Sequence, residues 1–455
     1  MSGASHARSA ALRQVALDAI RPDRAVDILR HLIDTASPTG SERACAETLA
    51  MLLGQAGLPT EVDAFGADRA NLTARVGRDA GGLRLMLNGH LDTTGFGDAR
   101  DRGWLRRPGA SDNPVSRLED GVVSGLGAYN MKGGVAAAAE ALCALQSVAG
   151  ELPGLVSLAA VAGESEKAPV DALAAAFSGP AHTGGGVGSE RLLEGLMERG
   201  EAPDAVVVCE PSGLAIVNAQ PGYVLVQALI HGRAGYLPAP GLPTVVTVAA
   251  ELIRALAGWS ELYAAREALD CGLGTLRPPC TVGAIESGWP FKPGGPGDAA
   301  AIYLDLRVPP GRSRVRAVDE LREIVGRCIP PSGGFTAEVS EFARNTPGAL
   351  TPADHPLVVA MGEARAAGTG IRPGTAPDAD FPPGDDGKVF ARRGIPYVKM
   401  GPGSPASRDP RFGREQVGVD EVVLAARAYV CLAVDLASRP QASTAQWPPV
   451  VTGPD

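Results

Sequence analysis

The chain is poor in aromatic residues and has no paired cysteines of the kind that bind zinc or form redox dithiols. Phe, Trp and Tyr make up only 4% of its 455 residues, so Ala, Val and Leu must fill the core. The seven cysteines are scattered and contain no Cys-x-x-Cys pair, which argues against a zinc knuckle and a redox dithiol. Scattered cysteines in odd number are typical of the reduced thiols of a cytoplasmic protein.

Long basic and long apolar runs are also missing. The net charge of −9, with no Lys/Arg cluster, argues against a nucleic-acid partner. No apolar run approaches the roughly 18 residues that span a bilayer, and residues 1–24 lack the apolar segment of a signal peptide. We therefore expect a soluble, cytoplasmic protein with neither a nucleic-acid nor a membrane partner.

Short apolar runs alternate with helical stretches in the first half of the chain. Strands are expected at residues 72–76, 83–87, 155–161 and 205–208, and helices at 25–36, 42–57, 131–148 and 189–199. This alternation predicts an α/β fold with a mostly parallel, doubly wound sheet. Ligands bind beyond the carboxyl ends of the strands in such sheets. His90, Glu164 and Glu210 each follow an expected strand, so we expect them to share a site.

The pattern changes near residue 222. Strands at 223–230, 280–285 and 300–307, with helices at 243–257 and 317–328, give a β-α-β-β-α order. The earlier pattern returns with a strand at 396–400 and a helix at 420–436. We expect a catalytic domain in two parts, residues 21–219 and 335–437, interrupted by an α+β lid domain at 220–334. About 20 N-terminal residues are expected to be mobile, and the Pro-rich tail, 438–455, to be disordered.

Polar residues at the ends of these elements are candidates for chemistry. His90 and Asp92 suit a metal ligand and the carboxylate that orients it, although a core histidine bonded to an aspartate fits as well. Asn130 begins a helical stretch and fits a helix N-cap. Glu164 and Glu210 supply two carboxylates near the same edge. The sixth candidate, Glu166, fits either a ligand reached by a small loop adjustment or a solvated charge.

These motifs resemble the M20 family of aminoacylases and carboxypeptidases, which are dinuclear zinc hydrolases. The resemblance covers residues 21–437 and rests on Asn88-Gly-His-Leu-Asp92, Gly127-Ala-Tyr-Asn-Met-Lys-Gly-Gly134, Gly163-Glu-Ser165 and Cys209-Glu-Pro-Ser212. It implies that His90 and Glu210 bind metal, that Asp92 orients His90, and that Glu164 is the general base. It also implies an amino-acid-like or peptide-like substrate.

The expected lid domain carries two more matches to this family. Tyr236 stands where the family has a histidine that polarises the substrate carbonyl of the partner subunit, and a tyrosine hydroxyl could assist in the same way. Arg307, in Asp305-Leu-Arg307-Val-Pro-Pro-Gly311, resembles a residue that contacts a substrate carboxylate. The resemblance therefore also implies a homodimer formed through the lid domain.

Three of the five ligand positions differ from the family pattern. Asn130 replaces the aspartate that bridges the two metals, Ser165 replaces a glutamate, and Val417 stands in the place of a histidine. Neutral ligands are poor at holding two divalent cations, and uncompensated buried charge is costly. We therefore expect at most one zinc ion, held by His90, Glu210 and the Asn130 oxygen, with Asn130 also able to contact substrate.

Three functions remain open on the sequence. The first is a one-metal amide hydrolase of N-acyl amino acids or peptide-like molecules, in which Glu164 deprotonates water and Tyr236 assists the oxyanion. The second is a metal-free catalyst that uses Glu164 and His90 as acid and base for cyclisation, elimination or acyl transfer on an amino-acid-derived intermediate. The third is a binding protein that keeps the fold without catalysis.

Overall fold

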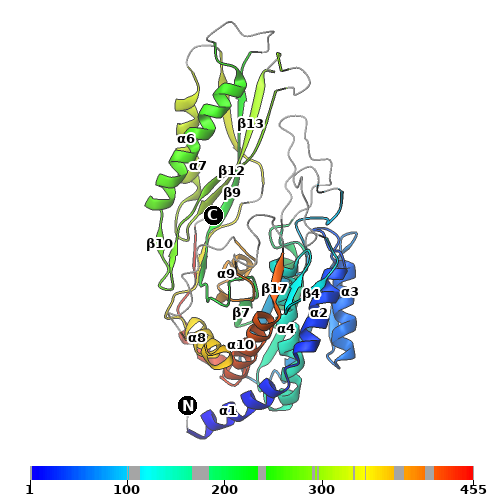
Figure 1. Ribbon diagram of the computed structural model, residues 1–455. Coiled ribbons are helices and arrows are strands. Elements are labelled where there is room, and N and C mark those ends of the chain that lie inside the picture. The colour runs from blue at the N-terminus through cyan, green and yellow to red at the C-terminus, as the bar shows by residue number, and fades with distance from the viewer. Residues whose placement is uncertain are drawn as a thin grey trace.

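Two sheets, each covered by helices, organise the chain (Figure 1). The computed structural model describes residues 3–99, 101, 113–165, 184–233, 242–288, 293–294, 297–330, 334–343, 345–372, 384–404 and 415–453. The larger sheet belongs to an α/β catalytic domain, and the smaller one belongs to an α+β lid domain inserted into it. Together they confirm the fold class that the sequence predicts.

The larger sheet has the strand order β1-β2-β6-β3-β7-β16. These strands are β1 (Thr60–Phe65), β2 (Arg69–Gly77), β6 (Leu155–Val161), β3 (Arg84–His90), β7 (Ala205–Val208) and β16 (Tyr397–Lys399). The last four in this order are parallel, and β1 and β2 add an antiparallel edge. The register pairs His90 with Val161 and Asn88 with Val208, so the carboxyl ends of β3, β6 and β7 lie at one edge.

Helices cover both faces of this sheet, which explains why its central strands are continuously apolar. One core cluster joins β2, β3 and β6 to helices on the first face: α2 (Pro22–Asp34), α3 (Arg43–Gln55), α4 (Gly133–Leu145), α8 (Pro356–Thr369) and α10 (Val419–Ala437). A second cluster joins residues of β3, β6 and β7 to two helices on the other face, α5 (Val187–Glu198) and α9 (Gly387–Ala391).

Helix α4 is buried along its whole length. All 13 of its residues are buried, and most are Ala, Gly or Val, which lets the helix pack closely between the sheet, α2 and α10. With the turns on either side, Ala128–Glu151 is long and apolar enough to cross a membrane by length and composition, yet 78% of its most apolar stretch is buried inside the protein. Packing inside the fold accounts for this composition.

The lid domain is a four-stranded antiparallel sheet with two helices on one face. Its strand order is β12-β13-β9-β14, with bounds β12 (Cys280–Ser287), β13 (Ala299–Val308), β9 (Gly222–His231) and β14 (Thr336–Glu341), and its helices are α6 (Val245–Arg266) and α7 (Arg314–Cys328). The predicted β-α-β-β-α order is present, but β14 adds a strand beyond it. Because β14 pairs with β9, the lid domain ends after Glu341 and not near residue 334.

Short strands tie the remaining segments to the two domains. One three-stranded sheet joins β4 (Arg117–Glu119), β5 (Val122–Ser124) and β17 (Gln416–Gly418). Another joins β8 (Ala219–Gln220), β15 (Ala349–Leu350) and β18 (Val451–Thr452), and a small hairpin joins β10 (Leu269–Asp270) to β11 (Thr275–Leu276). The β8 sheet lies where the chain enters and leaves the lid domain.

Both ends of the chain are more ordered than the sequence predicts. Residues expected to be mobile form α1 (Gly3–Asp18), which buries Ala16 and Leu17 against the catalytic domain. The tail expected to be disordered forms the 3₁₀ helix η6 (Gln441–Gln446) and then β18, which pairs with β15. The Trp447 ring packs edge-on against the ring of buried His355, with 5.0 Å between the ring centres. One aromatic contact therefore anchors a segment whose composition is otherwise typical of disorder.

Candidate functional site

The expected site residues meet at the carboxyl edge of the larger sheet. His90 is the last residue of β3, Glu164 and Ser165 follow β6, and Glu210 follows β7. Asn130 reaches the same place from the π-helical turn η3 (Ala128–Lys132), which precedes α4. The strand ends therefore bring together residues up to 120 positions apart, as the sequence predicts for a parallel sheet.

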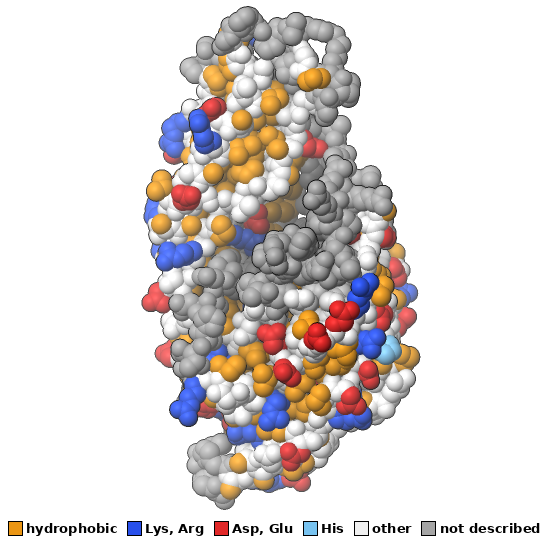
Figure 2. Space-filling model, in the orientation of Figure 1, with side chains coloured by type: hydrophobic (Ala, Val, Ile, Leu, Met, Phe, Trp, Pro, Cys, Tyr) orange, Lys and Arg blue, Asp and Glu red, His pale blue; other side chains and the backbone are white. Residues whose placement is uncertain are grey.

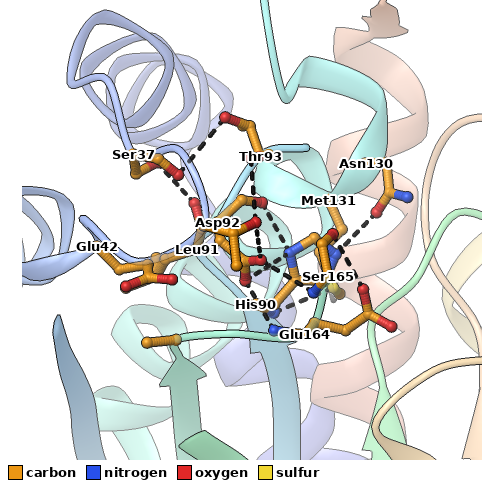
Figure 3. A network of polar contacts seen from close by, with 12 residues as sticks. Ser37, Glu42, His90, Leu91, Asp92, Thr93, Asn130, Met131, Glu164 and Ser165 are labelled. Carbon is orange, nitrogen blue, oxygen red and sulfur yellow. Dashed lines mark hydrogen bonds and ion pairs between the residues drawn. The ribbon is translucent and has the colours of Figure 1, made fainter. Parts of the chain in front are cut away.

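The two ring nitrogens of His90 face different groups (Figure 3). Nδ1 lies 2.9 Å from the backbone oxygen and 3.5 Å from Oδ1 of Asp92, so it is the donor nitrogen. Nε2 lies 2.9 Å from Oδ1 of Asn130 and 3.3 Å from Oε1 of Glu210. In a neutral ring the Nε2 lone pair would face two oxygen atoms, which is unfavourable. The arrangement therefore calls for a positive charge, either a cation between these groups or a proton on Nε2.

Electrostatics favours that positive charge. Burial alone lowers the pKa of His90, but the carboxylates of Asp92 and Glu210 outweigh it and raise the pKa well above the usual value. Burial likewise disfavours the charged form of Asp92, yet His90 and two backbone N–H groups hold its pKa at about 2. The site therefore concentrates negative charge around one buried imidazole.

Asp92 is fully buried and joins three segments. Its carboxylate accepts hydrogen bonds of 3.0 Å each from the backbone N–H groups of Glu164 and Ser165 and from the Thr39 hydroxyl. These bonds fix the loop after β6 against the end of β3. The sequence placed Asp92 among the catalytic residues, and its contacts are those of a group that orients His90 and positions Glu164.

Asn130 does not cap the helix that follows it, which corrects that interpretation of the sequence. The chain makes the turn η3 before α4 begins, so Lys132 occupies the N-cap position and the Asn130 side chain is free to contact His90. The carboxylate of Glu415 accepts hydrogen bonds from the backbone N–H groups of Gly127 (3.0 Å) and Asn130 (3.2 Å) and so holds this turn. No sequence pattern pointed to Glu415, because it is 285 residues away from Asn130.

Glu164 lies beside this group with its side chain partly exposed. Burial raises its pKa to about 7, against the opposing charges of Lys388 and His90. A carboxylate with this pKa can both accept and return a proton near neutral pH. Its Oε2 accepts a hydrogen bond of 3.3 Å from the Ser165 hydroxyl, which also lies 3.3 Å from the hydroxyl of Thr94.

Val417 and Ser165 contribute little that a metal could use. Val417 lies in β17, is 1% exposed, and packs against the start of α4 at Gly133. The Ser165 hydroxyl is occupied by Glu164 and Thr94. Within the described part of the chain, no three His, Cys, Asp or Glu side chains are grouped to hold a metal. A metal ion bound at His90 Nε2 and Glu210 would therefore need the amide oxygen of Asn130 as its third ligand.

Three further residues lie where the catalytic and lid domains meet. Arg307, on β13, forms a 2.7 Å ion pair with Asp305 and lies over the ring of Tyr223. Lys388, on α9, lies over the same ring. The sequence identified Arg307 but neither Tyr223 nor Lys388, since nothing in their spacing links them to His90. Two other predicted residues, Tyr236 and Glu166, lie outside the described residues.

Comparisons with known proteins agree with this fold. The chain resembles a tripeptidase from Staphylococcus aureus (18% identity, TM-score 0.66, covering 92% of this chain and 99% of that one). It also resembles the dipeptidase Dug1p from Saccharomyces cerevisiae (11%, 0.68, 95% and 99%) and a Bacillus subtilis protein described as a dinuclear metal-binding peptidase of the M20 family (15%, 0.57, 91% and 98%). At these identities the structures show the fold alone. The model of peptidase family M20/M25/M40 matches residues 86–435, and the chain therefore belongs to that family.

Proposed function

We propose that the protein is an amide-bond hydrolase that acts on an N-acyl amino acid or a peptide-like small molecule with one metal ion at most. The observation that carries this proposal is the convergence of Asn130 Oδ1 and Glu210 Oε1 on Nε2 of His90, with Glu164 beside them. Membership of a peptidase family supports amide hydrolysis as the reaction class. The substrate class follows from the same kinship.

His90 Nε2 and the two oxygen atoms that face it, from Asn130 and Glu210, suit a single ion. Their separations of 2.9 and 3.3 Å match the edges of a coordination shell whose bonds are about 2.0–2.2 Å long. His90 already donates through Nδ1 to Asp92, which leaves Nε2 as the ligand atom. Bound there, zinc would supply Lewis-acid polarisation of the substrate carbonyl. A second ion would have only an amide, a hydroxyl and the side chain of Val417, which does not fit.

Glu164 performs the proton transfers in this proposal. Its carboxylate takes a proton from the attacking water and delivers it to the leaving nitrogen as the amide bond breaks. The pKa of about 7 suits both steps near neutral pH. The Asp92 carboxylate accepts a hydrogen bond from the backbone N–H of Glu164. This bond keeps Glu164 and His90 in fixed positions relative to each other. In the same proposal Tyr236 donates a hydrogen bond to the developing oxyanion and Arg307 receives a substrate carboxylate.

We also propose a cytoplasmic homodimer formed through the lid domain. The edge strand β12 leaves Ile285 47% exposed, and α6 leaves Leu262 72% exposed. In Figure 2 hydrophobic side chains gather over α6 and the neighbouring strands of the lid domain. All seven cysteines are free, which suits a reducing compartment.

Metal content and turnover test the proposed reaction together. We expect up to one equivalent of zinc in the purified protein, hydrolysis of some member of a panel of N-acyl amino acids and dipeptides, and loss of turnover with a chelator. Glu164→Gln should lower kcat by about 10²-fold or more and leave metal content unchanged. Glu210→Gln, its matched control, should lower the metal content. Two bound ions, or full activity in Glu164→Gln, would contradict the proposal.

One observation favours a second candidate. The 2.9 Å contact between His90 Nε2 and Asn130 Oδ1 is also the contact that a protonated His90 makes without any metal. In that case Glu164 and His90 act as base and acid in a cyclisation, elimination or acyl transfer on an amino-acid-derived intermediate. Activity that persists in a metal-free preparation and is lost in both Glu164→Gln and His90→Gln would support this metal-free reaction.

A further inference from the structure

Two adjacent carboxylates, Asp385 and Asp386, lie buried at the start of α9. Burial of a charged group is costly unless other groups pair with it or donate hydrogen bonds to it. Helix α9 belongs to the catalytic domain and lies close to the lid domain (Figure 1). The partners of the two carboxylates therefore show which parts of the molecule this helix connects.

Asp385 contacts the segment through which the chain enters the lid domain. Its backbone N–H donates a 2.7 Å hydrogen bond to Oε1 of Gln220, and its Oδ1 accepts a 2.9 Å hydrogen bond from Nε2 of the same residue. Gln220 ends β8, directly before the lid sheet begins, and pairs with Ala349 on β15, by which the chain returns. Lys399 balances the charge of Asp385 with a 2.8 Å ion pair. One buried contact therefore holds both connections between the domains.

Asp386 contacts the start of α5 instead. Its Oδ2 accepts a 2.7 Å hydrogen bond from the hydroxyl of Ser189, and that hydroxyl oxygen accepts a 3.0 Å hydrogen bond from Nδ2 of Asn88. None of these three side chains is more than 2% exposed. Asn88 lies on β3, two residues before His90. These bonds fix α9, α5 and the end of β3 relative to one another.

A buried glycine-rich segment joins the start of α5 to the loop that carries Glu164. The backbone N–H of Gly185 donates a 2.8 Å hydrogen bond to the carbonyl oxygen of Glu164, whose own N–H donates to Asp92. Gly186 has a φ of +96°, and a Cβ there would lie 2.9 Å from Oδ1 of Asp386. Glycine is therefore required where this segment passes Asp386. The position of α5 is transmitted through the segment to the backbone of Glu164.

We propose that Asp385 and Asp386 are positioning residues that connect the entry to the lid domain, at Gln220, with the loop that carries Glu164. Their role in catalysis rests on the proposed function, because Glu164 is the general base there. A shift of the lid domain at Gln220 would move α9, α5 and the backbone of Glu164 together. A displacement of about 1 Å can cost on the order of 10²-fold in rate, so these residues would affect kcat without contacting the substrate.

Variants at the two ends of this connection test it in the purified full-length protein. Gln220→Met removes the amide at the lid entry, and Ser189→Ala removes the hydroxyl beside Asp386. We expect each to lower kcat by about tenfold or more, with KM and zinc content unchanged. The double variant should be no slower than the slower single variant, because both changes break the same connection. Independent effects would multiply to about 100-fold.

Two further comparisons separate positioning from a general loss of stability. Asp386→Asn keeps an oxygen that accepts from Ser189, so it should lose less kcat than Asp386→Ala. Ser157→Ala is the matched control, because the Ser157 hydroxyl contacts a backbone oxygen near the other end of β6, and its kcat should equal that of the wild type. Gln220→Asn, whose side chain is shorter, replaces Gln220→Met if the latter does not fold.

Amide hydrogen exchange measures the connection without relying on activity. We expect exchange at the Gly185 N–H to be about tenfold faster in Gln220→Met and in Ser189→Ala, and unchanged in Ser157→Ala. If exchange responds in this way and the wild type hydrolyses no substrate, the connection stands and the hydrolase proposal fails. The connection is refuted if the Gln220 variant leaves both kcat and this exchange unchanged, or if the effects on kcat multiply in the double variant.

Discussion

His90 determines what the site can bind, because its Nε2 faces oxygen atoms of two other side chains. One of these, Glu210, carries a charge, and the other, Asn130, does not. The number of negative charges around Nε2 sets the affinity for a divalent cation more strongly than small changes in distance do. In the proposed one-metal site, the neutral amide of Asn130 is therefore the ligand that would limit metal affinity.

Restoring a carboxylate at this position should strengthen metal binding. We expect Asn130→Asp to raise zinc affinity by about tenfold or more, since an anionic ligand replaces a neutral one. Competition with a chromophoric chelator measures the change. Asn113→Asp adds the same charge at an exposed position and should have no effect. Adding Ser165→Glu and Val417→His should bring the stoichiometry to two ions. Unchanged affinity in Asn130→Asp would place the metal elsewhere.

Glu42 is a buried residue whose ionisation should appear in the stability of the protein. Burial, with the nearby charge of Asp92, raises its pKa from 4.5 to about 7, although the Gly40 N–H and Arg69 favour the carboxylate. The folded protein thus disfavours the ionised form. The stability that protonated Glu42 contributes to the folded protein is complete below about pH 4.5 and is lost as the pH rises through about 7.

Glu42→Gln should remove this loss. At pH 8 we expect the variant to be more stable than the wild type by up to about 3 kcal/mol, and at pH 4.5 the two should be equal. Chemical denaturation of both proteins at several pH values measures the difference and cancels the titration of other groups. A difference that does not depend on pH would show that Glu42 ionises normally.

At the scale of elements, helix α4 and the end of β7 fix the distance between two halves of the site. Asn130 lies just before α4, and Glu210 lies just after β7. A Cβ at Gly134 would lie only 1.8 Å from the backbone oxygen of Cys209. Glycine is therefore required at this crossing, since any side chain would push the helix away from the strand.

Gly134→Ala should disturb both stability and metal binding. We expect a loss of about 3 kcal/mol or more, because the contact is with backbone that cannot move alone. Metal affinity should fall as well, because Asn130 and Glu210 separate. Gly54→Ala is the control, since nothing lies within 4 Å of a Cβ there and alanine favours its helix by up to about 1 kcal/mol. Equal behaviour of the two variants would contradict this account of the crossing.

For the whole molecule, the arrangement of two domains decides which charges can meet. The lid domain supplies Tyr223 and Arg307, and the catalytic domain supplies Lys388 and Glu164. The exposed edge of the lid sheet also remains free for pairing within the described residues, which is the usual requirement for β-strand association.

A charge on this edge should prevent dimer formation. We expect the wild type to sediment at micromolar concentration with the mass of two 46.5 kDa chains, and Ile285→Asp or Leu262→Glu to shift it toward one. Met51→Glu, on exposed α3 of the catalytic domain, should leave the mass unchanged. A wild-type protein that sediments as a single chain would refute dimerisation through the lid domain.

Much of the fold could be predicted from the sequence because local patterns encode it. The bounds of β6 and β7 match their apolar runs, and the lid order appears in the same way. Errors arose where long-range contacts decide. Both ends of the chain are ordered because apolar residues of α1 and the ring of Trp447 pack against the catalytic domain. Strand β14 joins the lid sheet by pairing with β9.

The sequence by itself determined the resemblance to the family, the edge of the sheet on which the site lies, and the neutral side chains of Asn130, Ser165 and Val417, because residue types and periodicity are local properties. Only the tertiary structure decided that Asn130 turns toward His90 and that Glu415 holds its turn. These relations join residues up to 285 positions apart, and burial creates their electrostatic consequences, which no local pattern records.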